Sequence, residues 1–400
     1  MKVLQINSVC GSGSTGRICK EISEKLSRNN IDNKVLYYSG TSDFVNSQKC
    51  SNDFYIKFQA LKSRIFGNYG FNSAISTQKT IKELEKFAPD IVHIHNIHGH
   101  DVNIKKLFDY LKDNNLQIVW TFHDCWAFTG YCTYFTFGKC EKWKIGCKNC
   151  PQRKKYSFFA DKSSKLFKLK NEISKNENIT VVTPSQWLAD LSRQSIFNNR
   201  RITVINNGID LTVFKPTESD FRQKYGINDS QTVILGVAFC WEKRKGLDVF
   251  IELSKRLDKN KFKIVLVGTN DNIDKVLPQD IVSIHRTNNQ QELAEIYSSA
   301  DILLNPTREE NFPTVNIEAL ACGIPVVTFV TGGSPEIIDE TCGEVVADDI
   351  DVITTKIEDI RINKPYSSSD CRKRAESFSK EEKYNEYLDL YKSLYDRKSK

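Results

Sequence analysis

Short runs of apolar residues alternate with amphipathic stretches along most of the chain. The apolar runs are rich in β-branched and aromatic residues, which is typical of strands buried in parallel sheets. In the first half they fall at residues 3–7, 34–38, 91–95, 117–122, 179–183 and 202–205, with a helix predicted over residues 16–29. In the second half the pattern begins again, with strands predicted at residues 232–237, 263–267, 282–284, 302–305 and 326–329 and helices at residues 247–257 and 291–299. Two successive strand–helix series predict an α/β fold of two Rossmann-like domains that face one cleft and are joined near residues 213–219.

The C-terminal segment has the pattern of a separate helix. Ser379 and Glu382 have the spacing of a capping box. An apolar stripe follows at helical spacing, formed by Tyr384, Tyr387, Leu388, Tyr391, Leu394 and Tyr395. Because such a stripe needs a surface to cover it, we expect the helix to cross back onto the first domain. The predicted organisation is an N-terminal domain over residues 1–207, a second domain over residues 208–376 and a terminal helix over residues 377–400.

Length and composition fit this organisation. A chain of 400 residues exceeds one ordinary core, and its 40% hydrophobic and 27% charged residues are those of a soluble globular protein. No apolar stretch approaches the ~20 residues of a membrane span. The N-terminus leads from Met1 into the first strand without the apolar segment of a secretory signal. We therefore expect a cytoplasmic protein.

The distribution of charge bears on possible partners. The net charge of +7 is mild, and a dedicated nucleic-acid-binding protein would show a concentrated basic stripe, so no nucleic-acid partner is expected. One stretch does mix basic side chains with aromatic and apolar ones: Arg153, Lys154, Lys155, Lys162, Lys165, Lys168 and Lys170 with Tyr156, Phe158, Phe159, Leu166 and Phe167. This mixture is typical of a segment that rests on an anionic membrane surface, although a solvated helix face has the same composition.

Cysteines crowd into one part of the first domain. In a reducing cytosol the twelve cysteines are not expected to form a disulfide framework. Four of them, in an insertion at residues 125–150, follow the spacing C-x7-C-x6-C-x2-C: Cys132, Cys140, Cys147 and Cys150. The last pair has the usual turn of a structural zinc site, and four thiolates complete a tetrahedron. We predict structural zinc, with a cluster of free thiols as the alternative and Cys125 as a spare or alternative ligand.

Two carboxylates bracket a turn in the second domain. Glu310 lies on the loop after the strand at residues 302–305, and Glu318 lies within the helix that starts near Pro313. Free backbone N–H groups and the positive end of the helix dipole lie between them. This arrangement suits a ligand with hydroxyls at both ends and a diphosphate in the middle, which is the shape of a nucleotide-sugar. Lys245, at the start of a helix after another strand, is placed to neutralise a diphosphate, with Lys243 or Arg244 in support.

Glycine turns precede two predicted helices. Gly11 and Gly13 follow the first strand, and Gly332 and Gly333 precede Ser334, so backbone amides there can approach a phosphate. The first turn lacks the lysine of a phosphate-cradling loop. No acidic residue stands convincingly after the second strand to bind a nicotinamide ribose, so a dehydrogenase is disfavoured.

Histidines mark the ends of two strands of the first domain. His123 follows the run at residues 117–122, where it can hydrogen-bond a sugar hydroxyl or a leaving phosphate or serve as a structural histidine. His93, His95, His98 and His100 raise the alternative of a metal site. Strand alternation puts His93 and His95 on the same face, and we favour sheet packing and a cleft wall.

Together these motifs resemble the large family of retaining glycosyltransferases with the GT-B fold, family 4 and group 1. The resemblance covers essentially the whole chain and rests on Glu310-x7-Glu318 with residues 319–327, the turn at residues 331–336, Lys245-Gly246, Pro184-Ser185, and residues 207–210 with Phe214 and Pro216. Residues 3–17, residues 120–128 and the cysteine cluster resemble a branch found in capsular, colanic-acid-like and other bacterial surface-polysaccharide clusters.

The resemblance implies transfer from a UDP- or GDP-sugar to a lipid-linked or polysaccharide acceptor, with retained anomeric configuration and no catalytic divalent metal. It implies a cytoplasmic enzyme that works peripherally on the inner face of the plasma membrane. Glu310 would bind donor-sugar hydroxyls, Glu318 the ribose and Lys245 the leaving diphosphate, while His123 would line the reacting centre. Further donor contacts would come from Arg244, Asn311, Phe312, Pro313, Thr314, Gly11, Gly13, Gly332 and Gly333. The family usually has an arginine five residues before the lysine, and this chain has Cys240 there.

Two rival interpretations stay open on the sequence. A zinc-stabilised binding protein would use the cysteine cluster and the basic stretch after it, but it leaves Glu310, Glu318 and Lys245 without a role. Another two-Rossmann sugar enzyme, an epimerase or a phosphorylase, is the closer rival. A phosphorylase usually needs a pyridoxal cofactor, for which no clear site is visible.

Overall fold

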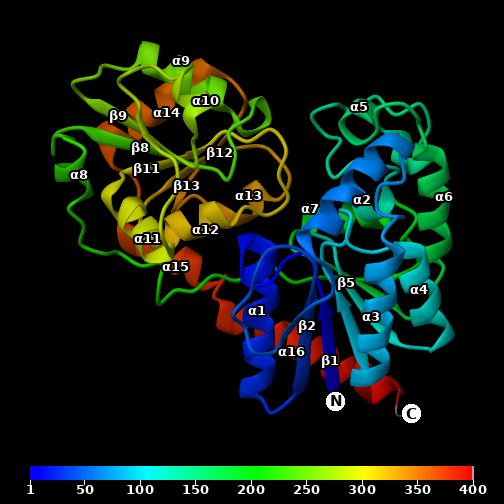
Figure 1. Ribbon diagram of the computed structural model, residues 1–400. Coiled ribbons are helices and arrows are strands. Elements are labelled where there is room, and N and C mark those ends of the chain that lie inside the picture. The colour runs from blue at the N-terminus through cyan, green and yellow to red at the C-terminus, as the bar shows by residue number, and fades with distance from the viewer. Residues whose placement is uncertain (399–400) are drawn as a thin grey trace. The chain divides into compact units, whose positions relative to one another are not determined.

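The computed structural model describes residues 1–398, which form two compact units (Figure 1). Unit 1 consists of Met1–Asn206 together with the residues from Lys383 onward, and unit 2 is Asn207–Glu382. The expected joint at residues 213–219 therefore lies inside unit 2. The reason is that Ile209 and Phe214 are buried in the core of that unit.

Unit 1 is built on a seven-stranded parallel sheet in the order β3-β2-β1-β4-β5-β6-β7. Its strands are β1 (Lys2–Ile6), β2 (Asp32–Tyr37), β3 (Ser47–Lys49), β4 (Ile91–Ile94), β5 (Gln117–Thr121), β6 (Ile179–Thr183) and β7 (Arg201–Val204). The central strands β1, β4, β5 and β6 are buried along nearly their whole length, because their apolar side chains pack against helices on both faces. The predicted strands are confirmed to within one or two residues at their ends.

Helices and short turns connect these strands: α1 (Gly13–Arg28), α2 (Asp53–Phe66), α3 (Ala74–Phe87), α4 (Ile104–Asp113), α5 (Arg153–Tyr156), α6 (Ser163–Ser174), α7 (Gln186–Arg193) and the 3-10 turns η1 (Trp126–Phe128) and η2 (Lys142–Lys144). The basic stretch predicted for the surface spans α5 and α6. One of its members, Lys170, is fully buried, because its ammonium donates to the Trp126 and Thr129 carbonyls at 2.6 and 2.9 Å. The prediction of a surface position was wrong for that residue.

Unit 2 is built on a six-stranded parallel sheet in the order β10-β9-β8-β11-β12-β13. Its strands are β8 (Thr232–Val237), β9 (Phe262–Val267), β10 (Val282–Ile284), β11 (Ile302–Asn305), β12 (Val326–Phe329) and β13 (Gly343–Val346). Its helices are α8 (Phe221–Lys224), α9 (Leu247–Arg256), α10 (Asp271–Asp274), α11 (Gln290–Ser299), α12 (Thr314–Ala321), α13 (Ser334–Ile337), α14 (Ile350–Asn363) and α15 (Ser368–Glu376), with the 3-10 turn η3 (Lys243–Lys245). Two clusters of buried side chains, one on each face of the sheet, form its core.

The terminal helix α16 (Lys380–Lys398) begins in unit 2 and packs on unit 1 (Figure 1, red). The predicted apolar stripe, apart from the half-buried Tyr395, is buried against α1 and the strands β1, β4, β5 and β6. Tyrosine hydroxyls add polar contacts, since Tyr384 donates to Glu21 at 2.6 Å and the Tyr391 hydroxyl lies 2.6 Å from His93 Nδ1. The Glu382 amide donates to the Ser379 hydroxyl at 3.3 Å, as the capping box requires. The predicted return of this helix to the first domain is confirmed.

Candidate functional site

The two predicted carboxylates lie where parallel strands of unit 2 end. β11 ends at Asn305 and α12 begins at Thr314, so the loop between them carries Glu310. This loop is held by hydrogen bonds at both ends: the Arg308 amide donates to the Arg244 carbonyl at 2.8 Å, and the Asn305 side chain donates to Asn316 at 2.8 Å. The carboxyl ends of parallel strands are the usual ligand-binding edge of such sheets.

Glu310 and Lys245 contact each other directly. The Lys245 ammonium lies 2.5 Å from a Glu310 carboxylate oxygen, and the two side chains are 21% and 17% exposed. The Asn311 amide donates to the other carboxylate oxygen at 3.0 Å. Burial raises the pKa of Glu310. Lys245, the Asn311 amide and Arg244 together lower it by more than burial raises it, so the pKa of Glu310 lies below the ordinary value. Glu310 is therefore a charged hydrogen-bond acceptor, and its partner is the lysine predicted to meet the diphosphate.

Positive charge near the predicted diphosphate position comes from Lys245 and its neighbour. The Arg244 guanidinium donates to the Glu309 carbonyl at 3.1 Å, which keeps it beside the Glu310 loop. Cys240, at the position where the family usually has an arginine, is exposed and lies after the end of β8. Arg308 is held by Asp248 at 2.7 Å and Asp348 at 2.6 Å. Arg244 is thus the arginine that stands beside the lysine in this chain.

Glu318 is placed by the first turns of α12. Its side chain is buried and accepts a hydrogen bond from the Tyr297 hydroxyl at 3.1 Å, a link from α11 that no sequence motif indicated. Phe312 and Pro313 are buried beside it, and Asn207 donates to the Phe312 carbonyl at 3.1 Å. Among the described residues, no side chain caps the start of α12 at Pro313, so backbone N–H groups there stay available to a ligand.

Glycines allow the backbone of neighbouring loops in unit 2 to pack closely against the loop that carries Glu310. Gly332 has a φ of +56°, and a Cβ on it would lie 1.9 Å from the Glu310 carbonyl oxygen. The Gly333 amide donates to the Asn311 carbonyl at 2.6 Å. Gly246 has a φ of +76°, and a Cβ there would lie 2.3 Å from the Pro306 carbonyl oxygen. Seven predicted donor-site residues therefore meet at one edge of this sheet: Arg244, Lys245, Glu310, Asn311, Phe312, Gly332 and Gly333.

Gly11 and Gly13 lie in unit 1, on the exposed loop between β1 and α1. The Gly11 amide donates to the Gly16 carbonyl at 2.9 Å, which tightens the turn, and no heavy atom lies within 4 Å of a Cβ built on Gly13. Within the described residues, Ser12 makes no side-chain cap to α1. Exposed amides at this helix start are therefore compatible with a phosphate.

His123 lines a crevice at the carboxyl ends of β4 and β5 in unit 1. Its Nε2 lies 3.1 Å from His95 Nδ1, and the two rings are stacked with centroids 5.4 Å apart. Burial lowers the pKa of His123 to about 4, so the ring is neutral at neutral pH. His98 pairs with Asp124 at 2.9 Å in the same crevice, and this ion pair, which sequence reasoning missed, puts a charged couple beside His123.

His93 in β4 and His95 directly after it both contact other side chains of the protein. His93 lies 2.6 Å from the Tyr391 hydroxyl and 2.8 Å from Thr121, and His95 lies 3.1 Å from Gln5. In the described part of the chain, the only three metal-binding side chains whose ligand atoms all lie within 4.8 Å of one another belong to the exposed residues Asp271, Asp274 and His285. The packing interpretation of His93 and His95 agrees with these contacts.

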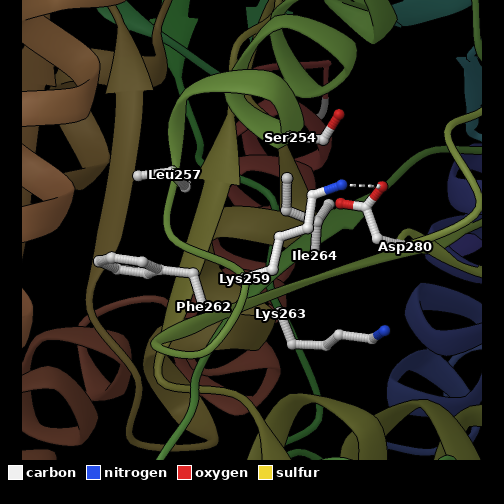
Figure 2. Close-up of a pocket in the computed structure, with 7 residues that line it drawn as sticks. All are labelled: Ser254, Leu257, Lys259, Phe262, Lys263, Ile264 and Asp280. Atoms are coloured by element: carbon white, nitrogen blue, oxygen red, sulfur yellow. Dashed lines mark ion pairs between the residues drawn. The ribbon is translucent and has the colours of Figure 1, made fainter.

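A separate hollow in unit 2 lies away from the predicted donor residues. Figure 2 shows its wall, which comes from the end of α9 and the start of β9 and carries an ion pair of 3.2 Å between Lys259 and Asp280. Phe262 and Ile264 lie at the amino end of β9. Because Glu310 stands after the carboxyl end of a parallel strand, the hollow belongs to the opposite edge of the sheet.

Two family models match almost the whole chain between them. Residues 15–213 match the model described as Glycosyltransferase Family 4, and residues 217–378 match the model described as Glycosyl transferases group 1. The chain belongs to this family of glycosyltransferases.

Similar proteins agree with this assignment. The glycosyltransferase is 23% identical over 355 residues to the putative colanic acid biosynthesis glycosyl transferase WcaC of Escherichia coli K12, covering 84% of this chain and 83% of WcaC. Sucrose-phosphate synthase from Thermosynechococcus elongatus matches with a TM-score of 0.72 and 16% identity over 99% of both chains. Anabaena HepE, solved in complex with UDP-glucose, matches with a TM-score of 0.69 and 14% identity over 98% of this chain and 100% of HepE. The fold is that of the GT-B glycosyltransferases, with two parallel-sheet Rossmann-like domains.

Proposed function

We propose that this glycosyltransferase moves a sugar from a UDP- or GDP-sugar to a lipid-linked or polysaccharide acceptor in bacterial surface-polysaccharide synthesis, with retention of the anomeric configuration. The observation that carries the donor class is the Lys245–Glu310 pair beside the uncapped start of α12. One fixed cation, one carboxylate and free backbone amides match the diphosphate and hydroxyl groups of a nucleotide-sugar. The similarity to WcaC supports the polysaccharide acceptor, and the UDP-glucose bound to HepE supports the donor.

The proposed reaction breaks the bond between the anomeric carbon and the diphosphate oxygen and forms one to an acceptor hydroxyl oxygen. The acceptor proton leaves with the diphosphate, so the step balances without an oxidant or reductant. Negative charge grows on the diphosphate as the bond breaks, and Lys245 with Arg244 would stabilise it. Glu310 would then exchange its contact with Lys245 for hydroxyls of the sugar, while Glu318 would accept from the ribose.

A surface on unit 1 supports a membrane-bound acceptor. α2 exposes three apolar side chains at helical spacing, Phe54, Phe58 and Leu61, with Phe66 at its end. Phe158 and Phe159 extend the surface, since the Phe158 amide donates to the Arg64 carbonyl at 2.7 Å. We call these six residues the aromatic patch.

Exposed cations lie in the same two segments as the aromatic patch: Lys57, Lys62 and Arg64 in α2, and Lys154 and Lys155 in α5. Apolar side chains ringed by cations are typical of proteins that rest on an anionic bilayer. None of the helices in the described residues is long and apolar enough to cross a membrane. From the aromatic patch and its cations we infer that the enzyme lies peripherally on the cytoplasmic leaflet, where the patch would hold it beside a lipid-linked acceptor.

The first test of the donor site is release of free nucleotide from UDP- and GDP-sugars by the purified protein, with and without a membrane extract as acceptor source. We expect turnover of one donor, lost by a factor of 100 or more in Glu310→Ala, on the order of the loss from removing one transition-state contact. Glu340→Ala, an exposed glutamate of the same unit, is the matched control. Near-normal turnover in Glu310→Ala would overturn the site assignment. Proton NMR of the product would report the anomeric configuration.

The membrane part of the proposal is tested by flotation with lipid vesicles. The protein should float with vesicles containing phosphatidylglycerol and remain behind with pure phosphatidylcholine, and added salt should weaken the binding. The double variant Phe58→Ser/Leu61→Ser should lose most of the binding. Ile362→Ser, which removes an exposed apolar side chain of unit 2, should keep it. Equal flotation of both variants would exclude the aromatic patch as the docking surface.

A further inference from the structure

The cysteine-rich insertion of unit 1 has little regular structure. Between the end of β5 at Thr121 and the start of α6 at Ser163, the described residues contain two 3-10 turns and the four-residue helix α5. Loops of this length without their own secondary structure are uncommon inside compact domains. Yet the insertion is ordered around buried aromatic side chains, with the ring of Trp143 5.0 Å from that of Phe135 and 5.3 Å from that of Phe128. Aromatic packing therefore supplies order that regular secondary structure does not.

Four cysteines pack against this aromatic core. Among the described residues no three of their sulfurs lie within 4.8 Å of one another, so a shared ion would require some of these side chains to turn toward it. Cys132 is buried, and Cys140, Cys147 and Cys150 are half-buried against the same core. The Sγ atoms of Cys132 and Cys150 lie 4.0 Å apart. In a tetrahedral zinc site with Zn–S bonds of about 2.3 Å, the sulfurs are about 3.8 Å apart. This pair therefore already has the spacing of one edge of such a site, although the two residues are far apart along the insertion.

The turn between Cys147 and Cys150 is shaped as a chelating knuckle. Asn149 takes a left-handed conformation with a φ of +48°, and Lys142 donates to its carbonyl at 2.9 Å. The Gly130 amide donates to Cys147 Sγ at 3.2 Å, and a Cβ on Gly130 would lie 3.0 Å from the Cβ of Cys147. A backbone amide aimed at a sulfur favours the thiolate, which is the form that binds a metal.

A buried cation lies beside this cluster. Lys170 is fully buried, with its Nζ atom 3.6 Å from the centre of the Trp126 ring. Burial lowers the pKa of Lys170, while Cys147, Asp124 and Cys132 oppose that shift. A buried ammonium is costly unless an opposite charge lies near it. Four thiolates around one Zn²⁺ would add a net charge of minus two to that of Asp124, whereas four neutral thiols would add none.

We propose that Cys132, Cys140, Cys147 and Cys150 bind one Zn²⁺ ion in a closed tetrahedral site that ties the insertion to the core of unit 1. Binding replaces four thiol protons with four Zn–S bonds and releases those protons to solvent. All four ligand positions come from the protein, so the site is structural and takes no part in sugar transfer. The inference stands apart from the proposed reaction.

The test is the metal content of the full-length protein, purified under reducing conditions without added chelator. Elemental analysis should find one zinc per chain in the parent protein and in Cys240→Ser, which removes an exposed cysteine of unit 2. Cys147→Ser and Cys150→Ser should lose most of it. Cys125→Ser tests whether Cys125, a buried cysteine of the same insertion, is a ligand. We expect this variant to keep its zinc.

Variants that fail to fold would lose zinc for an uninformative reason, so the parent protein needs a second measurement. Expression in cobalt-supplemented medium should give the intense visible absorption of tetrahedral Co²⁺ bound to four thiolates. Titration with a mercurial should release one metal ion as four thiols react. The inference is overturned if the folded parent contains neither zinc nor this cobalt spectrum. It is equally overturned if the mass is lower by two hydrogens because Cys132 and Cys150 form a disulfide.

Discussion

Gly332 allows the turn before α13 to pack closely against the loop that carries Glu310. Gly332 combines a φ of +56° with contact against the Glu310 carbonyl, so Gly332→Ala adds a methyl group that has no space unless the loop moves. We expect this variant to lose at least tenfold in nucleotide release, because displacements near 1 Å at a reacting centre are costly. The assay is the donor screen used for Glu310→Ala.

Gly226→Ala is the matched control for this prediction. Gly226 has a similar φ of +62°, but no heavy atom lies within 4 Å of its Cβ position. Both variants bear the cost of a positive φ for alanine, about 1–2 kcal/mol. Only in Gly332→Ala would the added methyl group also clash with the backbone of the Glu310 loop. Equal activity of the two variants would show that the Glu310 backbone position is not critical for turnover.

At the scale of elements, the histidines at the ends of β4 and β5 predict acid sensitivity of unit 1. Burial lowers the pKa of His100 and His123 to about 4 and lowers the pKa of His93 and His95 well below 6.5. The unfolded chain binds protons at these rings below about pH 6.5, whereas the folded chain does not. The free energy of unfolding should therefore fall as the pH drops from 6.5 towards 4.

Asp101 and His98, in the same region, affect the pH dependence of the free energy of unfolding differently from these four histidines. Burial raises the pKa of Asp101 to about 6, which opposes the loss over part of this range. Although burial lowers the pKa of His98, Asp124 raises it above 6.5. The stability that His98 contributes is therefore complete only well below pH 6.5, where the ring is protonated in both the folded and the unfolded state. Four depressed histidines against one raised aspartate leave a net loss of stability in acid.

His123→Gln should reduce this slope by up to about 1.4 kcal/mol per pH unit, the value for one proton. Urea unfolding at several pH values, followed by tryptophan fluorescence, measures it, since four of the five tryptophans lie in unit 1: Trp120, Trp126, Trp143 and Trp187. His285→Gln is the control, because Asp274 raises the pKa of this exposed histidine of unit 2. An unchanged slope in His123→Gln would mean that His123 is protonated in the folded protein.

The elements also show what the sequence makes predictable. β8, β10, β11 and β12 begin and end at the predicted residues, because each is a short, mostly apolar run that lies between turns or loops. β3 was not predicted, since its sequence Ser47–Lys49 contains no apolar side chain and it exists only by pairing with β2. α2 was also missed, because its aromatic side chains lie on the exposed face.

For the candidate site, the sequence predicted individual residues but not the contacts between them. Glu310, Glu318 and Lys245 follow from their positions after strands and on helices, which local sequence encodes. The contact of Lys245 with Glu310, the Tyr297–Glu318 hydrogen bond and the burial of Lys170 join residues far apart in the chain. Nothing in the local pattern distinguishes these residues from their solvent-exposed neighbours, so such contacts become visible only in the folded structure.

For the whole molecule, the division into two units with separate sheets and cores predicts two unfolding transitions in calorimetry. Unit 1 has its own buried clusters, as does unit 2, and α16 belongs to unit 1 from Lys383 onward. Each unit should therefore melt as its own cooperative transition. Tryptophan fluorescence, dominated by unit 1, identifies which transition belongs to which unit.

Because the proposed donor residues lie in unit 2, we expect a bound nucleotide to raise the Tm of the unit 2 transition and not that of unit 1. A nucleoside diphosphate at 100 times its Kd adds about 2.7 kcal/mol to the free energy of unfolding of the unit that binds it. For a unit of this size, that corresponds to a rise in Tm of roughly 5–10 °C. We expect the shift in the unit 2 transition, with either UDP or GDP and not both, and its loss in Lys245→Ala but not in Lys255→Ala. A shift confined to unit 1 would move the nucleotide site to the Gly11–Gly13 loop, because that loop holds the other exposed helix start predicted to meet a phosphate.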